Sequence, residues 1–348
     1  MKKRRLLSNA ELAAFLNQTA MVIKAGITPS EGMEILKEDT LSSEGRELLE
    51  MISHSCSCGK HFSEALSDTG VFPEYIINLV ILGEESGNLD EVLTALADYY
   101  DREDDISEGV RSAFAYPLIM IGMMVVIIVI LISKVLPIFK QVFAQLGTKM
   151  SPFAEKLLGI GDALSNSAVI VTIVLIVLVA AFFLMFKVPS LNKKIRMLLA
   201  KFPLTKDFYY NIAAGRFASG MFLSLQSGMD TFKSLDMITE LVENENMINK
   251  IKIVREEIMN RSTMPEALSK ANVFSNLYTK MISVGYRSGT SDTVMKSISE
   301  RYEKATYKQL QKLLSIIEPT LVIVLSVIVG IILLSVLLPL MGIMSSIG

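Results

Sequence analysis

The sequence has little of the chemistry that most metal sites and nucleophilic enzymes use. It holds two cysteines and two histidines, and all four lie in one segment, 54–61. These are metal-ligand residue types, but C-x-C is not the usual spacing of a zinc site, and Cys56 aligns with Ile258 of the repeat described below. We expect a helix end here and no metal site; the weak candidates for metal ligands are His54, Cys56, Cys58, His61 and Glu84.

Charge is absent from three long stretches of the chain. Leu118–Ser133, Ala168–Phe186 and Thr320–Met344 contain no Asp, Glu, Lys or Arg. About 20 apolar residues suffice for a helix to cross a bilayer, and a helix without an amphipathic face is not typical of a soluble core. The sequence therefore predicts three transmembrane helices, at 117–136, 168–186 and 319–344.

The predicted spans also lack the carboxylates that ion-coupled transporters and membrane proteases usually place inside the bilayer. No histidine lies near a candidate nucleophile elsewhere in the chain. These two absences argue against an enzyme and against an ion-coupled transporter, so we expect neither catalytic residues nor a cofactor.

Basic residues near the predicted spans set the orientation of the chain in the membrane. The segment 187–206 holds six lysines and arginines, whereas the predicted outer loop, 137–167, holds three. By the positive-inside rule the large domains, 1–116 and 187–318, are cytoplasmic and the C-terminus lies outside. Polar residues such as Asn9 interrupt any apolar run after the basic N-terminus, so no signal peptide is expected.

The chain contains a direct repeat with an offset of 202 residues and no gap. Glu64–Ser67 aligns with Glu266–Ser269, and the alignment extends into the predicted spans, where Pro117 meets Pro319. So constant an offset over roughly 130 residues indicates a duplication. Each copy would be one cytoplasmic domain followed by its own membrane helix, and the extra span, 168–186, would return the chain to the cytoplasm between them.

Within each copy the apolar pattern is helical, without the period-two alternation typical of strands. We expect an all-α fold, with two homologous cytoplasmic helical-bundle domains plus three transmembrane helices. Thr28–Glu31 is a capping box with proline at the first helical position, and Asp230 would cap the matching helix. The last helix of each copy should be long and continue into the membrane, with Pro117 and Pro319 kinking it or marking where the bilayer begins.

The segment Gly83–Asp90 is the most distinctive part of the soluble sequence. Its glycines indicate a helix end, a turn and a new helix, but a turn does not explain Glu84 and Glu85, which could bind a partner or a cation. The second copy has Tyr286 and Arg287 there. This candidate structural or partner motif, with the glycines predicted to end the first helix of each copy, comprises Gly26, Gly83, Glu84, Glu85, Ser86, Gly87, Asp90, Gly228, Gly285, Ser288, Gly289 and Asp292.

The two copies have diverged in charge. Residues 1–116 hold 10 Lys and Arg against 21 Asp and Glu, whereas residues 187–318 hold 20 against 13. Part of the second imbalance comes from lysines that flank the membrane. The asymmetry favours docking of unlike domains within an oligomer, or two different partners.

Together these features resemble the type II secretion system F and type IV pilus inner-membrane platform proteins, a family that includes the Gram-positive competence-pilus version. The resemblance covers nearly the whole chain and depends on the duplicated domain, the Gly83–Leu89 turn and Tyr116–Pro117 at the start of the first span. The second copy departs from it, because Tyr286 replaces the first glutamate of the turn. The membrane-helix residues of this motif set are Pro117, Pro137, Glu318, Pro319, Gly330 and Pro339.

The resemblance implies a non-enzymatic assembly platform in the prokaryotic cytoplasmic membrane, with its N-terminus in the cytoplasm. It implies a homo-oligomer whose cytoplasmic domains contact a hexameric assembly ATPase and whose membrane helices receive pilin or pseudopilin subunits. Other inner-membrane assembly proteins and membrane lipid are further expected partners; nucleic acid is not. A motility pilus, a competence pilus and a secretion pseudopilus all fit, and the competing classes are a generic membrane scaffold and a transporter subunit.

Overall fold

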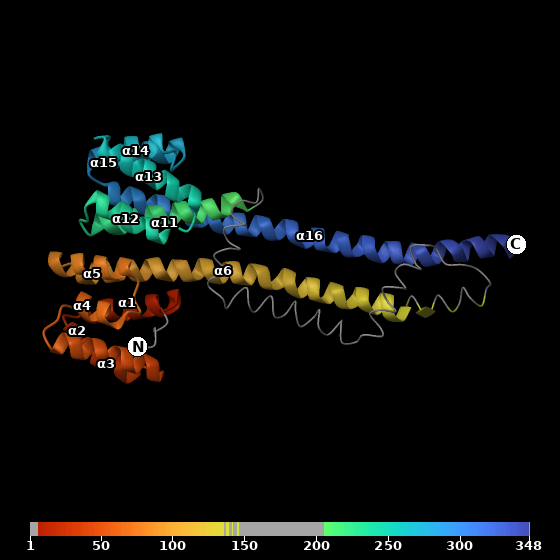
Figure 1. Cartoon of the computed structure of the whole chain (residues 1–348), viewed down its shortest axis with the longest axis horizontal. Coiled ribbons are helices and arrows are strands. Elements are labelled where there is room, and N and C mark those ends of the chain that lie inside the picture. The colour runs from red at the N-terminus through yellow and green to blue at the C-terminus, as the bar shows by residue number, and fades with distance from the viewer. Residues whose placement is uncertain (1–5, 136, 139–140, 142–144, 146–204, 348) are drawn as a thin grey trace. The chain divides into compact units, whose positions relative to one another are not determined.

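The computed structural model describes residues 6–135, 137–138, 141, 145 and 205–347 (Figure 1). Every secondary-structure element in these residues is a helix, and this part of the chain contains no strand, which confirms the all-α prediction. The second predicted span, 168–186, lies outside the described residues, as do nearly all of the predicted outer loop and the first part of the second domain, 187–204.

The described part of the first copy forms α1 (Asn9–Lys24), α2 (Pro29–Asp39), α3 (Ser43–Ser57), α4 (Phe62–Thr69), α5 (Glu74–Ser86) and α6 (Leu89–Ile130), followed by one π-helical turn, η1 (Leu131–Val135). Capping residues fix where these helices begin. Ser8 caps α1 in a reciprocal pair with Glu11, and Thr28 caps α2 by accepting from the backbone N–H of Glu31. Pro29 occupies the first position of α2, as predicted, but only the Thr28 half of the predicted capping box forms, because the Glu31 side chain makes no return hydrogen bond to Thr28.

The described part of the second copy forms α11 (Lys206–Gln226), α12 (Thr231–Leu241), α13 (Glu245–Met259), α14 (Met264–Lys270), α15 (Asn276–Ser288) and α16 (Ser291–Ile347). From α12 to α16, each helix begins 202 residues after its counterpart in the first copy. Asp230 caps α12, which confirms that prediction. The duplication therefore holds helix by helix.

The two copies also share their left-handed backbone positions. Gly59 and Gly70 of the first copy have φ of 84° and 65°, and the matching Arg261 and Asn272 keep positive φ at 65° and 49°. A non-glycine residue in this region costs roughly 1–2 kcal/mol, so the shared fold requires the conformation even where glycine has been lost. The other pairs with positive φ are Gly26 with Gly228 and Gly87 with Gly289.

Both copies contribute to one compact unit, which consists of residues 1–109 and 205–309. A single hydrophobic cluster runs through it, with Leu16 and Ile76 of the first copy and Phe217 of the second fully buried. The repeat alone suggests two separate bundles, so the contact between the copies is a finding of the structure. The exact domain boundaries remain a prediction.

The helices α6 and α16 continue past this compact unit without a break. Each contains a window of 18 residues that is long and apolar enough to cross a membrane, with mean hydropathy of 1.9 and 2.4. These windows are 6 % and 0 % buried, which is not typical of the core helix of a soluble protein. Pro117 and Pro319 lie inside the two helices. The long last helix predicted for each copy is confirmed.

Candidate functional site

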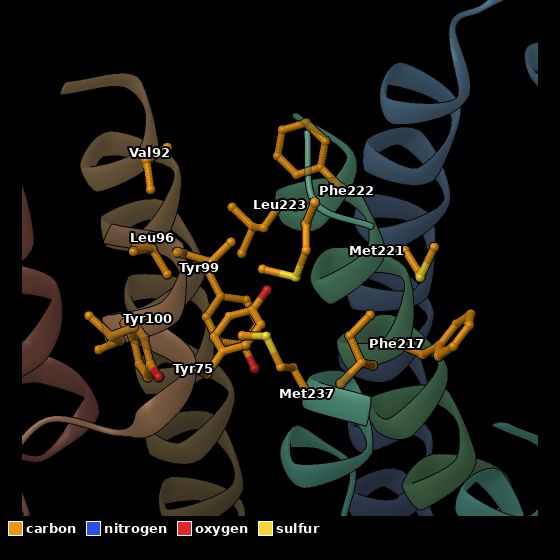
Figure 2. Close-up of a cluster of buried hydrophobic side chains, with 14 of the residues drawn as sticks. Tyr75, Val92, Leu96, Tyr99, Tyr100, Phe217, Met221, Phe222, Leu223 and Met237 are labelled. Atoms are coloured by element: carbon orange, nitrogen blue, oxygen red, sulfur yellow. The ribbon is translucent and has the colours of Figure 1, made fainter. Parts of the chain in front are cut away.

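Along its middle, α11 is buried on all sides. Every residue from Phe217 to Ser224 is buried, whereas the matching stretch of α1 exposes Asn17, Gln18 and Met21. An ordinary amphipathic helix buries only one face. The other face of α11 is covered by α5 and α6 of the first copy, and we call this contact the inter-repeat surface (Figure 2).

Large apolar side chains fill the inter-repeat surface. Figure 2 shows Tyr75 and Tyr99 of the first copy on one side and Leu223 and Met237 of the second copy on the other. Each of the four is at most 8 % exposed. Buried aromatic side chains of this size dominate the energetics of such contacts, so the two copies are held together chiefly by apolar packing.

Gly220 lies at this surface, where it accepts a hydrogen bond from the first copy and lets α11 pack closely on α12 of its own copy. The hydroxyl of Tyr75 donates a hydrogen bond to the carbonyl oxygen of Gly220 at 3.4 Å. A Cβ at Gly220 would lie 2.7 Å from Cγ1 of Ile238, so no larger residue fits between α11 and α12 without a shift. Burial, followed by the neighbouring Tyr100, raises the pKa of the Tyr75 hydroxyl, which therefore stays a proton donor.

An ion pair crosses the inter-repeat surface. Arg216 donates from Nη2 to Oε2 of Glu103 at 2.7 Å and from Nε to both carboxylate oxygens at 3.0 Å. Its Nη1 donates to the carbonyl oxygen of Leu241 at 3.4 Å and lies 3.7 Å from Oε2 of Glu243. The side chains of Arg216 and Glu103 are only 16 % and 10 % exposed. Such a paired, desolvated geometry fixes how the copies meet.

The charges of the pair depend on each other. Burial alone would lower the pKa of Arg216, but the charge and hydrogen bonds of Glu103 raise it well above its ordinary value.

A second, longer ion pair joins the copies nearby, with Arg102 Nε 4.0 Å from Oε2 of Glu303. Burial raises the pKa of the Glu303 carboxyl despite Arg102. Removing either Glu103 or Arg216 would leave the remaining charge buried without a partner, in a medium of low dielectric.

Two cavities lie along the inter-repeat surface. One of about 20 Å³ adjoins the Glu103–Arg216 pair and has room for about one water molecule. The other, about 220 Å³, is lined by the acidic Asp98 and by the basic Lys24 and Lys296, among others. Both are smaller than the pockets of roughly 300–1,000 Å³ that bind small molecules.

The turn that begins at Gly83 has the same construction in both copies. Gly87 and Gly289 end α5 and α15 in the left-handed region, and the next backbone N–H donates to the carbonyl oxygen of Gly83 or Gly285, at 3.0 and 2.8 Å. A Cβ at Gly285 would lie 2.7 Å from Cγ2 of Val294. The paired glycines thus let each long helix pack closely on the helix before it.

The polar residues of the turn also make local interactions within their own copy. The hydroxyls of Ser86 and Ser288 each donate to a carbonyl oxygen four residues earlier. Asp90 and Asp292 lie in the first turns of α6 and α16, where the helix dipole favours a negative charge. The helix end, turn and restart predicted here are confirmed in both copies; a role in binding a partner remains a prediction.

Glu84 caps a helix that has no cap of its own. His61, at the N-cap of α4, makes no side-chain cap hydrogen bond. The Glu84 carboxylate instead accepts from the backbone N–H groups of Phe62 and Ser63 at 2.7 and 3.1 Å, and from the Ser63 hydroxyl. This task explains Glu84 without a partner or a cation, whereas Glu85 is exposed and stays a candidate for partner contact.

The second copy caps the matching helix, α14, with different residues. Thr263 and Glu266 form a capping box at the start of α14, with the N–H of Thr263 donating to Glu266 at 2.9 Å. The position of Glu84 is therefore released from capping, and Tyr286 stands there. The departure from the family pattern at this turn has a physical reason within the fold.

Replacing Glu84 by alanine is expected to destabilise the start of α4 by about 1–2 kcal/mol, because two backbone donors lose their acceptor. Hydrogen exchange of the Phe62 and Ser63 amides in the detergent-solubilised full chain should become correspondingly faster. Tyr286→Ala is the matched control and should leave α14 unchanged, because that helix has its own cap. Equal exchange in the Glu84 variant and the wild type would contradict the assignment.

The four Cys and His residues do not form one site. Sγ of Cys58 lies 3.8 Å from Nε2 of His54, and Nδ1 of His61 lies 4.0 Å from Oε1 of Glu84. Within the described residues no group of three His, Cys, Asp or Glu side chains could hold a metal ion. Cys56 packs against the core, and burial, with a smaller effect of Glu84, raises the pKa of its thiol. Such a thiol is a weak nucleophile.

One residue of the membrane-helix motif, Glu318, contacts a residue at the start of the first predicted span. The hydroxyl of Tyr116, beside Pro117, donates to Oε1 of Glu318 at 3.2 Å, so one position of the first copy meets its own counterpart in the second. At Gly330 a Cβ would meet none of the described residues, so their packing does not explain that glycine. Pro339 lies in α16, and Pro137 follows η1. The functional roles of these residues remain predictions.

The fold defines the class: a duplicated protein whose described elements are all helices, two of them long and apolar. Comparison with known families then identifies it, because the family model for the type II secretion system (T2SS), protein F, matches residues 15–137 and again residues 217–339. The two matches are offset by the same 202 residues as the helices. The chain belongs to the type II secretion system protein F family.

Curated relatives cover almost the whole chain. It is 28 % identical over 343 residues to the type IV pilus assembly protein PilC of Thermus thermophilus, a match that covers 97 % of this chain and 84 % of the relative. The PilC of Pseudomonas aeruginosa is 25 % identical, covering 97 % and 91 %. The type II secretion system protein F of Xanthomonas campestris is 24 % identical, covering 99 % and 86 %. The names of the relatives thus refer to two systems, type IV pilus assembly and type II secretion.

The inter-repeat surface was not predicted from the sequence, although a signal was present. The exposed Asn17 and Gln18 of the first copy are replaced in the second by the small residues Ser219 and Gly220. Loss of the polar face in one copy only indicates that a second surface covers it.

Proposed function

We propose that this chain is the inner-membrane platform of a type IV pilus or type II secretion pseudopilus machine, without catalytic activity of its own. In this role it couples a cytoplasmic assembly ATPase to the insertion of pilin or pseudopilin subunits. The other partners are inner-membrane assembly proteins and membrane lipid. Membership of the protein F family and the names of the relatives support this class of function.

The observation that carries the coupling is the continuity of α6 and α16. Each helix begins in the compact unit at a glycine turn and runs unbroken into an apolar stretch long enough for a bilayer. A continuous helix transmits a displacement along its axis, because nearly every turn is held to the next by hydrogen bonds. We infer that a movement imposed on the compact unit by the ATPase reaches the bilayer through these two helices.

The topology that suits this mechanism places the compact unit in the cytoplasm. The N-terminus is then cytoplasmic, the C-terminus lies outside, and a further span at 168–186 returns the chain between the copies. The basic residues at 187–206 support this orientation. A generic scaffold would not need unbroken helices between its soluble and apolar parts.

Inserting a flexible Gly-Gly-Ser-Gly segment after Ser112 tests the coupling. Ser112 is exposed on α6 beyond the compact unit. The variant should reach the membrane in normal amounts and co-purify with the assembly ATPase, but pilus or pseudopilus assembly should be lost. The same insertion after Leu41, which is 95 % exposed between α2 and α3, is the control and should be tolerated. Normal assembly by the Ser112 variant would overturn the proposal.

A further inference from the structure

The contact of α5 and α6 with α11 and α12 is head-to-tail. The α5–α6 side of the first copy covers the α11–α12 side of the second, so the two copies use different sides (Figure 2). A contact between identical sides would bury the same positions in both copies. Instead, Tyr75 is 2 % exposed and its counterpart Leu277 is 63 % exposed. Each copy therefore leaves exposed one side whose equivalent in the other copy is buried in the inter-repeat surface.

The first uncovered side belongs to the second copy and lies on α15. Leu277, Lys280, Val284 and Arg287 follow one another at intervals of three and four residues, which places them on one face of the helix. All four are exposed, Val284 by 67 %. We call these four residues the open α15 face; it is apolar with a basic margin.

The second uncovered side belongs to the first copy and lies on α1 and α2. Its counterparts in the second copy, Leu223 and Met237, are buried in the inter-repeat surface, whereas Met21 and Ile35 are 63 % and 43 % exposed. Both exposed residues have remained apolar. The residues that we call the open α1–α2 face are Gln18, Met21, Glu31, Glu34, Ile35 and Glu38, all exposed.

We propose that the open α15 face of one molecule docks on the open α1–α2 face of a second copy of this chain. The contact would repeat, between molecules, the arrangement that α5 and α11 already have within one. Lys280 and Arg287 give the open α15 face a basic margin, whereas Glu31 and Glu38 make the open α1–α2 face acidic. Complementary charge around an apolar centre is the anatomy of a specific interface.

The divergence in charge between the copies suits this contact. A surface that was acidic on both copies would repel itself in a head-to-tail arrangement, whereas an acidic first copy and a basic second copy attract. Because the two faces differ, the contact is heterologous and can continue from molecule to molecule until a ring closes. The inference rests on the repeat and its burial pattern, and not on the proposed platform role.

Cysteine cross-linking of the full chain tests the contact directly. With Cys56 and Cys58 replaced by serine, Gln18→Cys is placed in one tagged copy and Leu277→Cys in a second. These positions match Gly220 and Tyr75, which touch within one molecule. Mild oxidation in native membranes should link the two tags into a mixed dimer. Leu277→Cys paired with Met259→Cys, an exposed position on α13, is the control and should not cross-link.

Charge reversal gives a second, independent measurement. Lys280→Glu with Arg287→Glu should abolish the mixed dimer, and adding Glu31→Lys with Glu38→Lys should restore it. All four positions are exposed, so the fold of the single molecule should survive each change. A dimer formed by Leu277→Cys alone would show contact between identical faces and overturn the proposal. So would the absence of a mixed dimer, or a mixed dimer that charge reversal leaves unchanged.

Discussion

Arg216→Ala is expected to destabilise the compact unit by about 3–5 kcal/mol, because it leaves the buried carboxylate of Glu103 without its cation. Whole domains are stable by only about 5–15 kcal/mol, so a loss of this size is a large part of the total. It should appear as faster hydrogen exchange in α6 and α11 of the detergent-solubilised full chain, since these helices carry the two partners.

A matched control separates burial from charge in this experiment. Arg255 pairs with Asp236 at 2.8 Å, but both side chains are about half exposed. Arg255→Ala should therefore cost less than about 1 kcal/mol. The double variant Glu103→Leu with Arg216→Met should recover most of the loss, because no charge then remains buried. If Arg216→Ala cost no more than Arg255→Ala, the pair would not hold the copies together.

Much of the fold was predictable because a helix or turn predicted in one copy can be checked at the matching position of the other copy. Capping by Thr28 and Asp230 and the turn at Gly87 follow from local backbone chemistry, which the sequence states directly. The long last helices follow from an apolar pattern that no turn signal interrupts. These features depend on neighbours a few residues away, and for that reason they could be predicted.

The contact between the copies could not be predicted in the same way. Glu103 and Arg216 are 113 residues apart, and neither recurs at the matching position of the other copy, so the repeat gives no hint that they pair. The task of Glu84 was missed for a similar reason, since its donors lie on α4, in an earlier part of the chain. A contact between residues far apart in the sequence gives only an indirect signal in that sequence, such as the missing polar face of α11.

The strongest test of the inter-repeat surface compares two matching positions in one chain. Leu223→Ala should cost about 2–5 kcal/mol, because it opens a cavity where α11 meets the first copy. Met21→Ala, at the same place in the repeat, should cost less than about 0.5 kcal/mol, because Met21 is exposed on the single molecule. Hydrogen exchange at dilutions where the detergent-solubilised chain is monomeric measures both. Equal losses would mean that α11 is not covered by the first copy, and the head-to-tail contact would lose its basis.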